Sequence, residues 1–169
     1  MAETMLTEPI AKLVVSIGQQ QMTGFCKQGD TIFCKQVATA KNGVGQQSGS
    51  ECTPLGSHRI RAKIGHDAPL NSVFVGRRFT GELYSAELSR EYPDRDWILT
   101  RIMWLCGNET GFNRGGSVDT QRRYIYIHGA PDSHQMGVPS SHGCIKMRNA
   151  DIIELFDRVA VGLPVLIEE

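Results

Sequence analysis

The chain has 169 residues, and its 18 Lys and Arg balance its 18 Asp and Glu, so the formal net charge is zero. The basic residues are scattered, which excludes the basic surface of a nucleic-acid-binding protein and the cationic face of a membrane-associated one. With no internal repeat or linker, this length predicts a single domain over residues 1–169 with its own core.

The cysteines form an odd set without any CxxC spacing: Cys26, Cys34, Cys52, Cys106 and Cys144. This pattern argues against a disulfide framework and a structural zinc ribbon, and it suits a reducing compartment. The N-terminal segment has an acidic start and an apolar run too short for a signal-peptide core or a membrane span. We therefore expect a cytoplasmic protein, or a periplasmic one if a leader has been removed.

The first third of the sequence predicts a β-meander followed by a loop. Strands are expected over residues 12–17, 22–26 and 31–39, with hairpin-turn chemistry in Lys-Gln-Gly-Asp between the last two. Residues 41–51 are rich in Gly, Gln and Ser and predict a flexible surface loop. The turn sequence Thr-Pro-Leu-Gly follows, and the next strand is expected over residues 57–64.

The middle of the chain is less regular. Gly and Pro interrupt residues 65–96, which predicts irregular structure with short strands such as 72–75. Residues 97–106 suit a buried strand or a helix, and their Thr and β-branched content favours the strand. The polar loop 108–120 carries Arg114 and Asp119, which could reach a ligand, although a solvated loop is the simpler interpretation.

Alternation returns in residues 123–128 and predicts a strand. Tyr124, Tyr126 and His128 would share one face, and Ile125 and Ile127 would point to the core, so His128 would end the strand on a partly solvated face.

The last part of the chain predicts a helix and a strand. Asn149 is the expected N-cap, and apolar residues at three-to-four spacing predict an amphipathic helix over 150–161. A last strand over 163–167 completes a mainly β domain.

One Cys and one His are candidates for nucleophilic catalysis. A thiol attacks as its thiolate, and a histidine can accept its proton and stabilise the ion pair. The loop between His128 and Ser141-His142-Gly143-Cys144 is long enough to bring Cys144 back beside His128. The backbone N–H groups of Gly143 and Cys144 could form an oxyanion hole.

Two other interpretations remain open on these residues alone. Cys144 could be a small buried apolar residue. A zinc site formed by His128, His134, His142 and Cys144 is a weaker alternative, because their spacing is irregular.

A longer motif narrows these alternatives. The His-Gly pair, the run GVPSSHGCIKMRN, the helix after it, the pattern GLPVLI and the upstream Thr-Pro-Leu-Gly together resemble the catalytic domain of the L,D-transpeptidases, the YkuD domain. The resemblance extends from about Lys12 to Ile167. It implies a β-rich, β-sandwich-type YkuD-like domain with one amphipathic helix after the catalytic motif.

The resemblance also implies roles for single residues. Cys144 corresponds to the nucleophile, His128 to the base, and the Gly129 carbonyl would orient the imidazole. The substrate and oxyanion site would be formed by His142, Ser141, Gly143 and Lys146. Tyr126 is a further candidate for lining the site, and packing against a neighbouring strand is equally open for it.

Two departures from the family pattern concern substrate contacts. Lys146 stands where many members have Arg, which keeps the charge and loses the bidentate fork. Residues 37–40 read Val-Ala-Thr-Ala where many members have Val-Ser-x-Gly.

The implied reaction is acyl transfer on peptidoglycan tetrapeptide stems through a thioester of Cys144, with the terminal D-Ala as leaving group. Because we expect a cytoplasmic protein, soluble muropeptides and water are the expected partners, which predicts an L,D-carboxypeptidase of cell-wall recycling. The alternatives are an L,D-transpeptidase that forms 3→3 cross-links and an inactive peptidoglycan-binding module. No cofactor or metal ion is expected, and carbapenem-type β-lactams are expected to acylate Cys144.

Overall fold

The computed structural model describes residues 8–169 and shows a mainly β fold. The strands are β1 (Lys12–Ser16), β2 (Gln21–Phe25), β3 (Thr31–Gln36), β4 (Gly56–Ile64), β5 (Ser72–Val75), β6 (Arg78–Leu83), β7 (Ile98–Gly107), β8 (Tyr126–Ala130), β9 (Ile145–Arg148) and β10 (Pro164–Glu168). The helices are α2 (Ala86–Glu91) and α3 (Asn149–Arg158), and η1 (Gly116–Val118) is a single 3-10 turn.

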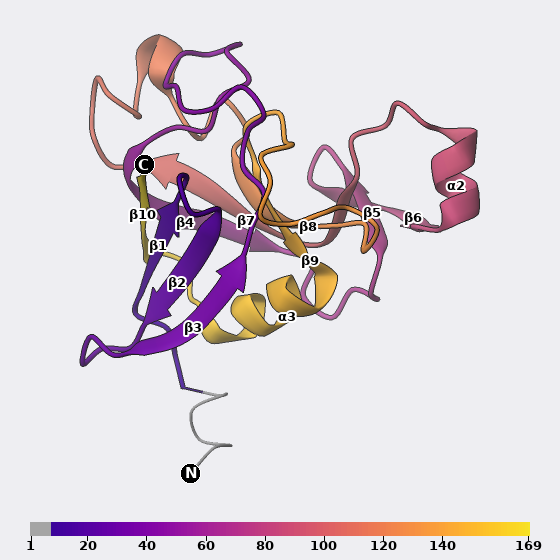
Figure 1. The fold of residues 1–169 in the computed structure, drawn as a ribbon, viewed down its shortest axis with the longest axis horizontal. Helices are drawn as coiled ribbons and strands as arrows, with labels where there is room; N and C mark the ends of the chain where they lie inside the picture. Colours follow the sequence, from indigo (N-terminus) through magenta and orange to yellow (C-terminus); the bar gives the residue numbers. More distant parts are fainter. Residues whose placement is uncertain (1–7) are drawn as a thin grey trace.

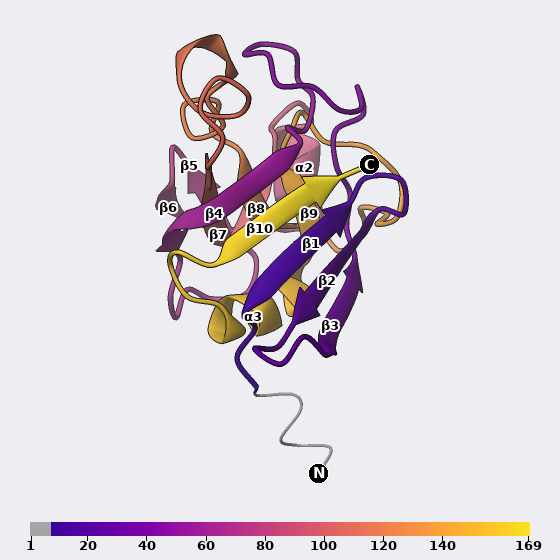
Figure 2. The same ribbon diagram turned by 90° about the vertical axis from the view of Figure 1, so that its left-hand side faces the viewer.

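All these strands belong to one curled sheet. They are joined in the order β3-β2-β1-β10-β4-β7-β5-β6, while β8 pairs with β7 and with β9. In Figure 2 the strands β4, β10, β1, β2 and β3 lie side by side in front of β8 and β9, and Figure 1 shows the same two layers from the side. The curl gives the sandwich-like arrangement that the sequence predicted.

The N-terminal meander follows the predicted alternation. Leu13, Val15 and Met22 point inward from β1 and β2 and are fully buried. The last strand β10 pairs in parallel with β1 and in antiparallel fashion with β4, so the two ends of the chain are joined in the sheet.

Helix α3 lies beneath the sheet in Figure 1 and closes the core. Its buried residues Ile152, Leu155 and Phe156 belong to the same apolar cluster as Leu13 and Val15. The predicted amphipathic helix is therefore confirmed, although it ends at Arg158 and not at residue 161.

The predicted N-cap of this helix is wrong. Asn149 is the first helical residue, and the cap position belongs to Arg148, whose side chain makes no capping bond. The Asn149 side chain is buried and bonded to other segments instead: it accepts from Thr100 Oγ1 at 2.6 Å and donates to Asn71 Oδ1 at 2.9 Å. Because the Asn149 amide is itself buried, leaving these two hydrogen bonds unmade would cost more than a local cap contributes.

The segment 65–96 contains a hairpin of β5 and β6, as expected of short strands, and the helix α2, which was not predicted. Ser85 caps α2 by accepting the Leu88 N–H at 3.1 Å. The helix has no buried residue, and Figure 1 shows it standing away from the body. Its apolar periodicity is correspondingly weak.

The strand before the catalytic motif starts later than predicted. Tyr124 has a positive φ of 57° and lies in a turn, so only Tyr126 and His128 share a face of β8. That face is not partly solvated as predicted, since Tyr126 is 5% exposed and His128 is 1% exposed. Phe74 from the β5–β6 hairpin packs with Tyr126 and covers it.

Within residues 8–169, no helix has both the length and the apolar character needed to span a membrane.

Candidate active site

The parallel pairing of β8 with β9 brings the predicted Cys and His together. His128 lies opposite Lys146 in the register, and Cys144 comes two residues earlier, on the same side of the sheet. The Tyr126 N–H donates to Cys144 Sγ at 3.3 Å, and the thiol donates to the Tyr124 carbonyl at 3.4 Å. Cys144 and His128 both line one cavity of about 490 Å³.

Most of the predicted site residues line this same cavity. Tyr126, Ser141 and His142 join Cys144 and His128 there. Ser141 and Tyr126 are buried, whereas the His142 side chain is 66% exposed at the edge.

The position of His128 fixes its tautomer. Its Nδ1 lies 2.7 Å from the Gly129 carbonyl, which can only accept, so Nδ1 carries the proton and Nε2 is free to act as a base. Glycine is required at 129, since a Cβ there would come within 2.6 Å of Asn149 Oδ1 and of the Leu99 carbonyl. Burial lowers the pKa of His128, and Lys146 and His134 lower it further against the opposing effects of Gly129 and Asp96.

The surroundings of Cys144 favour the neutral thiol over the thiolate. Burial raises the pKa of Cys144 to about 12, and the nearby Asp96 carboxylate adds to this. The Tyr126 N–H and the Arg123 guanidinium oppose the rise without cancelling it. Since the lowered pKa of His128 in the same cavity favours a neutral imidazole, a reaction at this thiol needs proton transfer to Nε2 as the sulfur attacks.

Ser141 holds the loop in front of Cys144. Its Oγ donates to the Cys144 carbonyl at 2.5 Å and accepts the Gly143 N–H at 3.2 Å. The Gly143 N–H thus has a partner already, and using it as an oxyanion donor would break this bond. Gly143 also has a φ of +128°, and a Cβ there would meet Ile125 and the Cys52 carbonyl.

Thr53 from the Thr-Pro-Leu-Gly element fixes the same loop from the other side. Its buried Oγ1 donates to the Gly143 carbonyl at 3.0 Å and accepts the Ala40 N–H at 2.9 Å. Isolated bridges pair Ala38 with Lys146 and Ala40 with Ser141, so residues 37–40 lie directly against the motif. The sequence predicted only a turn at Thr53, because this contact spans ninety residues.

Lys146 is not placed in the Cys144 cavity. It is 7% exposed and donates to His134 Nδ1 at 3.4 Å, in a separate cavity of about 390 Å³. Burial lowers its pKa, and Asp96 opposes that effect.

Two charged residues of the cavity were missed by the sequence analysis. Arg77 stands at the tip of the β5–β6 hairpin, donates to Tyr126 Oη at 3.0 Å and lies over the rings of Trp104 and Tyr124. The Asp96 carboxylate lies 4.0 Å from His142 Nδ1. Both residues come from the segment predicted to be irregular, and no local pattern indicates that they face Cys144.

A zinc site is not the arrangement found. Among the described residues, no three His, Cys, Asp or Glu side chains are grouped so as to hold a metal ion.

The fold is a curled sheet in which Cys144, directly before β9, and His128 of the adjacent parallel strand β8 line one cavity. This arrangement defines a β protein with a cysteine and histidine site. The family model of the L,D-transpeptidase catalytic domain, YkuD, matches residues 11–167. The chain therefore belongs to this family. Comparison with curated proteins gave no match.

Solved structures with the same fold are distant in sequence. Bd1075 of Bdellovibrio bacteriovorus aligns with a TM-score of 0.57 and 17% identity, over 95% of this chain and 48% of that one. L,D-transpeptidase 3 from Mycobacterium tuberculosis, solved with a faropenem-derived adduct, aligns with a TM-score of 0.55 and 18% identity, over 95% of this chain and 61% of that one. The Enterococcus faecium L,D-transpeptidase C442S mutant aligns with a TM-score of 0.54 and 18% identity, over 95% of this chain and 50% of that one. The chain thus spans less than two thirds of each of these proteins.

Proposed function

We propose that this protein is a cysteine-dependent acyltransferase on peptidoglycan tetrapeptide stems, and that it works as an L,D-carboxypeptidase releasing the terminal D-Ala. The observation that carries the proposal is the Cys144 thiol in one cavity with a His128 whose Nε2 is free, in a chain of the YkuD family.

The chemistry follows from the protonated thiol of Cys144 and the unprotonated Nε2 of His128. His128 Nε2 takes the thiol proton while Cys144 Sγ attacks the carbonyl that precedes D-Ala, and a tetrahedral oxyanion forms. The Cys144 N–H is the donor proposed for that oxyanion, since the Gly143 N–H is held by Ser141. When the C–N bond breaks, the leaving D-Ala amine takes the proton from His128, and a thioester remains on Cys144. Water then attacks the thioester and gives a proton to His128. When the C–S bond breaks, the Cys144 sulfur takes that proton from His128, which releases the acid and restores the free thiol and the neutral imidazole.

Arg77 is the proposed partner of the substrate carboxylate. The D-Ala leaving group ends in a carboxylate, and Arg77 is the basic residue lining the Cys144 cavity whose charge is permanent. Lys146, the position expected from the family pattern, lies outside that cavity. The hydrogen bond from Arg77 to Tyr126 and the rings beneath it hold the guanidinium near the thiol, with donors left for a carboxylate.

Water is the proposed acceptor because of the compartment in which the protein would work. All five cysteines are free thiols, and Cys34 among them is exposed, which suits a reducing cytoplasm. Soluble muropeptides would be the stems available there, and water would be in large excess. This supports a role in cell-wall recycling.

A second candidate is 3→3 cross-linking, with an amine of another stem in place of water. Its support is that several solved relatives of this fold are described as L,D-transpeptidases. One of them carries a faropenem-derived adduct, and another was solved with imipenem. By analogy, we propose that β-lactams of this kind acylate Cys144.

The products of one incubation separate these candidates. With a disaccharide-tetrapeptide, we expect mass spectrometry to show the loss of one alanine. A dimer of stems as the main product would instead support the transpeptidase. Cys144→Ala should abolish both products, whereas Cys34→Ala, a change at an exposed thiol outside the cavity, should leave turnover intact. Turnover by Cys144→Ala would overturn the thiol mechanism, and no turnover by the unmodified protein would favour a binding module.

A further inference from the structure

A second cavity, of about 810 Å³, lies over β4 and β7 beside the loop 107–122 and is larger than the cavity at Cys144. None of its lining residues lines the Cys144 cavity. Its occupant would therefore leave the thiol accessible, and the proposed function above does not require it.

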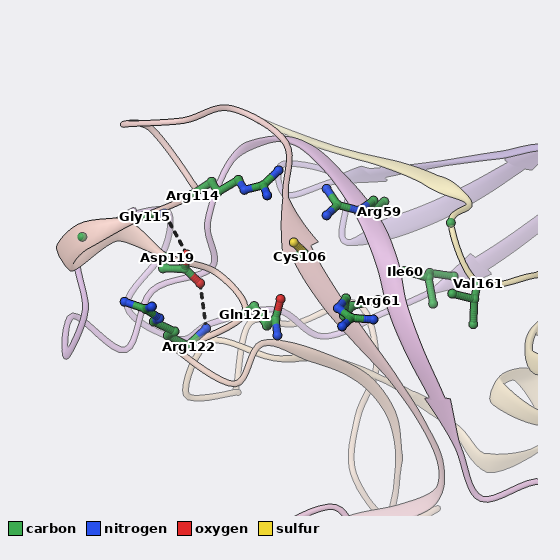
Figure 3. A pocket seen from close by; sticks show the side chains of 12 residues that line it. Arg59, Ile60, Arg61, Cys106, Arg114, Gly115, Asp119, Gln121, Arg122 and Val161 are labelled. Carbon is green, nitrogen blue, oxygen red and sulfur yellow. Dashed lines mark hydrogen bonds between the residues drawn. The ribbon is translucent and has the colours of Figure 1, made fainter.

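Four arginines from three segments line this second cavity, which we call the arginine cavity. Arg59 and Arg61 come from β4, Arg114 from the loop after β7, and Arg122 from the turn before β8. Figure 3 shows the Arg114 and Arg59 side chains extending toward each other, with Cys106 between them and Arg61 further along β4. Arg122 extends away from this group in the same view.

The positive charge of the arginine cavity is not balanced by the protein. Asp119 is the single acidic residue of the lining, and its two oxygens accept the Gly115 N–H at 2.7 Å and the Arg122 N–H at 2.9 Å. Burial disfavours the Asp119 charge, but these backbone bonds and Arg122 outweigh it and lower the pKa of Asp119. Its carboxylate is thus committed to shaping the loop.

The guanidinium groups themselves have few partners. Arg59 donates to the neutral Asn108 Oδ1 at 2.6 Å. Over the part of the chain that the structure describes, neither Arg61 nor Arg114 has a side-chain hydrogen bond or ion pair. Like charges held within one cavity repel each other, and an anion that binds there removes this repulsion.

We propose that the arginine cavity binds a small oxyanion with two or more negative charges, of the phosphate-ester or polycarboxylate class. Guanidinium groups match such anions because their N–H donors form a planar fork that binds two oxygens at once. The lining contains no aromatic side chain, so charge and hydrogen bonding, and not stacking on a base or sugar ring, select the ligand. The loop bearing Arg114 is anchored by the buried Asn113, which donates to the Ser57 carbonyl at 3.0 Å, so the arginines are presented by a fixed frame.

The test uses the whole chain and isothermal titration calorimetry with inorganic pyrophosphate and with citrate. The double variant Arg61→Ala/Arg114→Ala should weaken binding about tenfold or more for each arginine, because each charge-assisted bond contributes that much. Arg61→Lys/Arg114→Lys keeps the charge and loses the fork, and should give an intermediate affinity. Arg78→Ala removes an exposed arginine outside both cavities and is the matched control.

Each outcome decides a point. Binding of pyrophosphate without citrate assigns the site to phosphate-bearing anions, and comparable binding of citrate extends it to polycarboxylates. Failure of both anions to bind the unmodified chain at low ionic strength would overturn the proposal. So would an affinity that the double alanine variant shares with the unmodified chain, provided that circular dichroism shows both to be folded.

Discussion

The neutral resting state of Cys144 makes a quantitative prediction about its reactivity. Burial raises the pKa of this thiol from an ordinary value of 9.0 to about 12. Only the thiolate reacts with an alkylating reagent, so the reactive fraction at neutral pH is lowered about a thousandfold. The alkylation rate of Cys144 should therefore rise about tenfold with each pH unit, and it should not level off near the ordinary thiol pKa of 9.0.

Iodoacetamide labelling followed by peptide mass spectrometry measures this rate for each cysteine separately. The exposed Cys34 in the same chain serves as the reference for reagent and pH. Asp96→Asn should speed the labelling of Cys144, since the Asp96 charge raises the pKa of the thiol. A Cys144 rate that levels off at or below the ordinary thiol pKa would show a stable thiolate and imidazolium pair, and would refute the neutral resting state.

Two further predictions concern buried polar side chains, His58 in β4 and Thr53 in the Thr-Pro-Leu-Gly element. Burial lowers the pKa of His58 from 6.5 to about 4. Between these two pH values the His58 imidazole is protonated in the unfolded chain and neutral in the folded one. As the pH falls from 6.5 to 4, His58 should cost the fold about 3 kcal/mol of stability, and His128 and His134, whose pKa values are also lowered, add to the loss. Urea unfolding should therefore show a loss about 3 kcal/mol smaller in His58→Gln than in the unmodified chain and in His66→Gln. Thr53→Val leaves the Gly143 carbonyl and the Ala40 N–H without their partner, which should cost about 1–3 kcal/mol of stability and reduce kcat, with Thr53→Ser restoring both. Unchanged urea midpoint and kcat in Thr53→Val would contradict that role.

The elements with strong local patterns were predictable from the sequence. The alternation of β1 and β2 and the three-to-four spacing of α3 arise from burying one face of a strand or helix, and this constraint acts within a few residues. Asn149 shows why a local pattern can fail to predict a residue's role. Asparagine is a good N-cap, but the buried Thr100 and the half-buried Asn71 bind its amide instead, and nothing near Asn149 in the sequence indicates these two partners.

The composition of the site was predictable only in part, for a similar reason. Cys144 and His128 belong to a compact motif and meet through a single strand pairing. Arg77 and Asp96 reach the cavity from a hairpin tip and from the segment before β7, and their placement depends on how distant strands pack. The turn at Tyr124 was missed because a positive φ at a tyrosine is rare and has no sequence signal.

Lys146 was expected to contact the substrate, and its position indicates that it acts on the base instead. It pairs with His128 across the strands, lines a different cavity and is one of the charges that lower the pKa of His128. Removing that charge should raise the pKa of His128, so the base loses activity at a higher pH. We therefore expect Lys146→Met to move the acid limb of kcat/KM upward while KM at high pH stays close to that of the unmodified chain.

Lys41→Met removes an exposed lysine that lines none of the three cavities described above, and it should leave the profile in place. If Lys146→Met raised KM throughout and left the acid limb unmoved, the lysine would be a substrate contact after all. The departure from arginine at this position would then concern specificity. The expected result would mean that the residue at position 146 sets the pKa of His128. For that role the positive charge of a lysine is sufficient, and the bidentate guanidinium of an arginine has no carboxylate to bind.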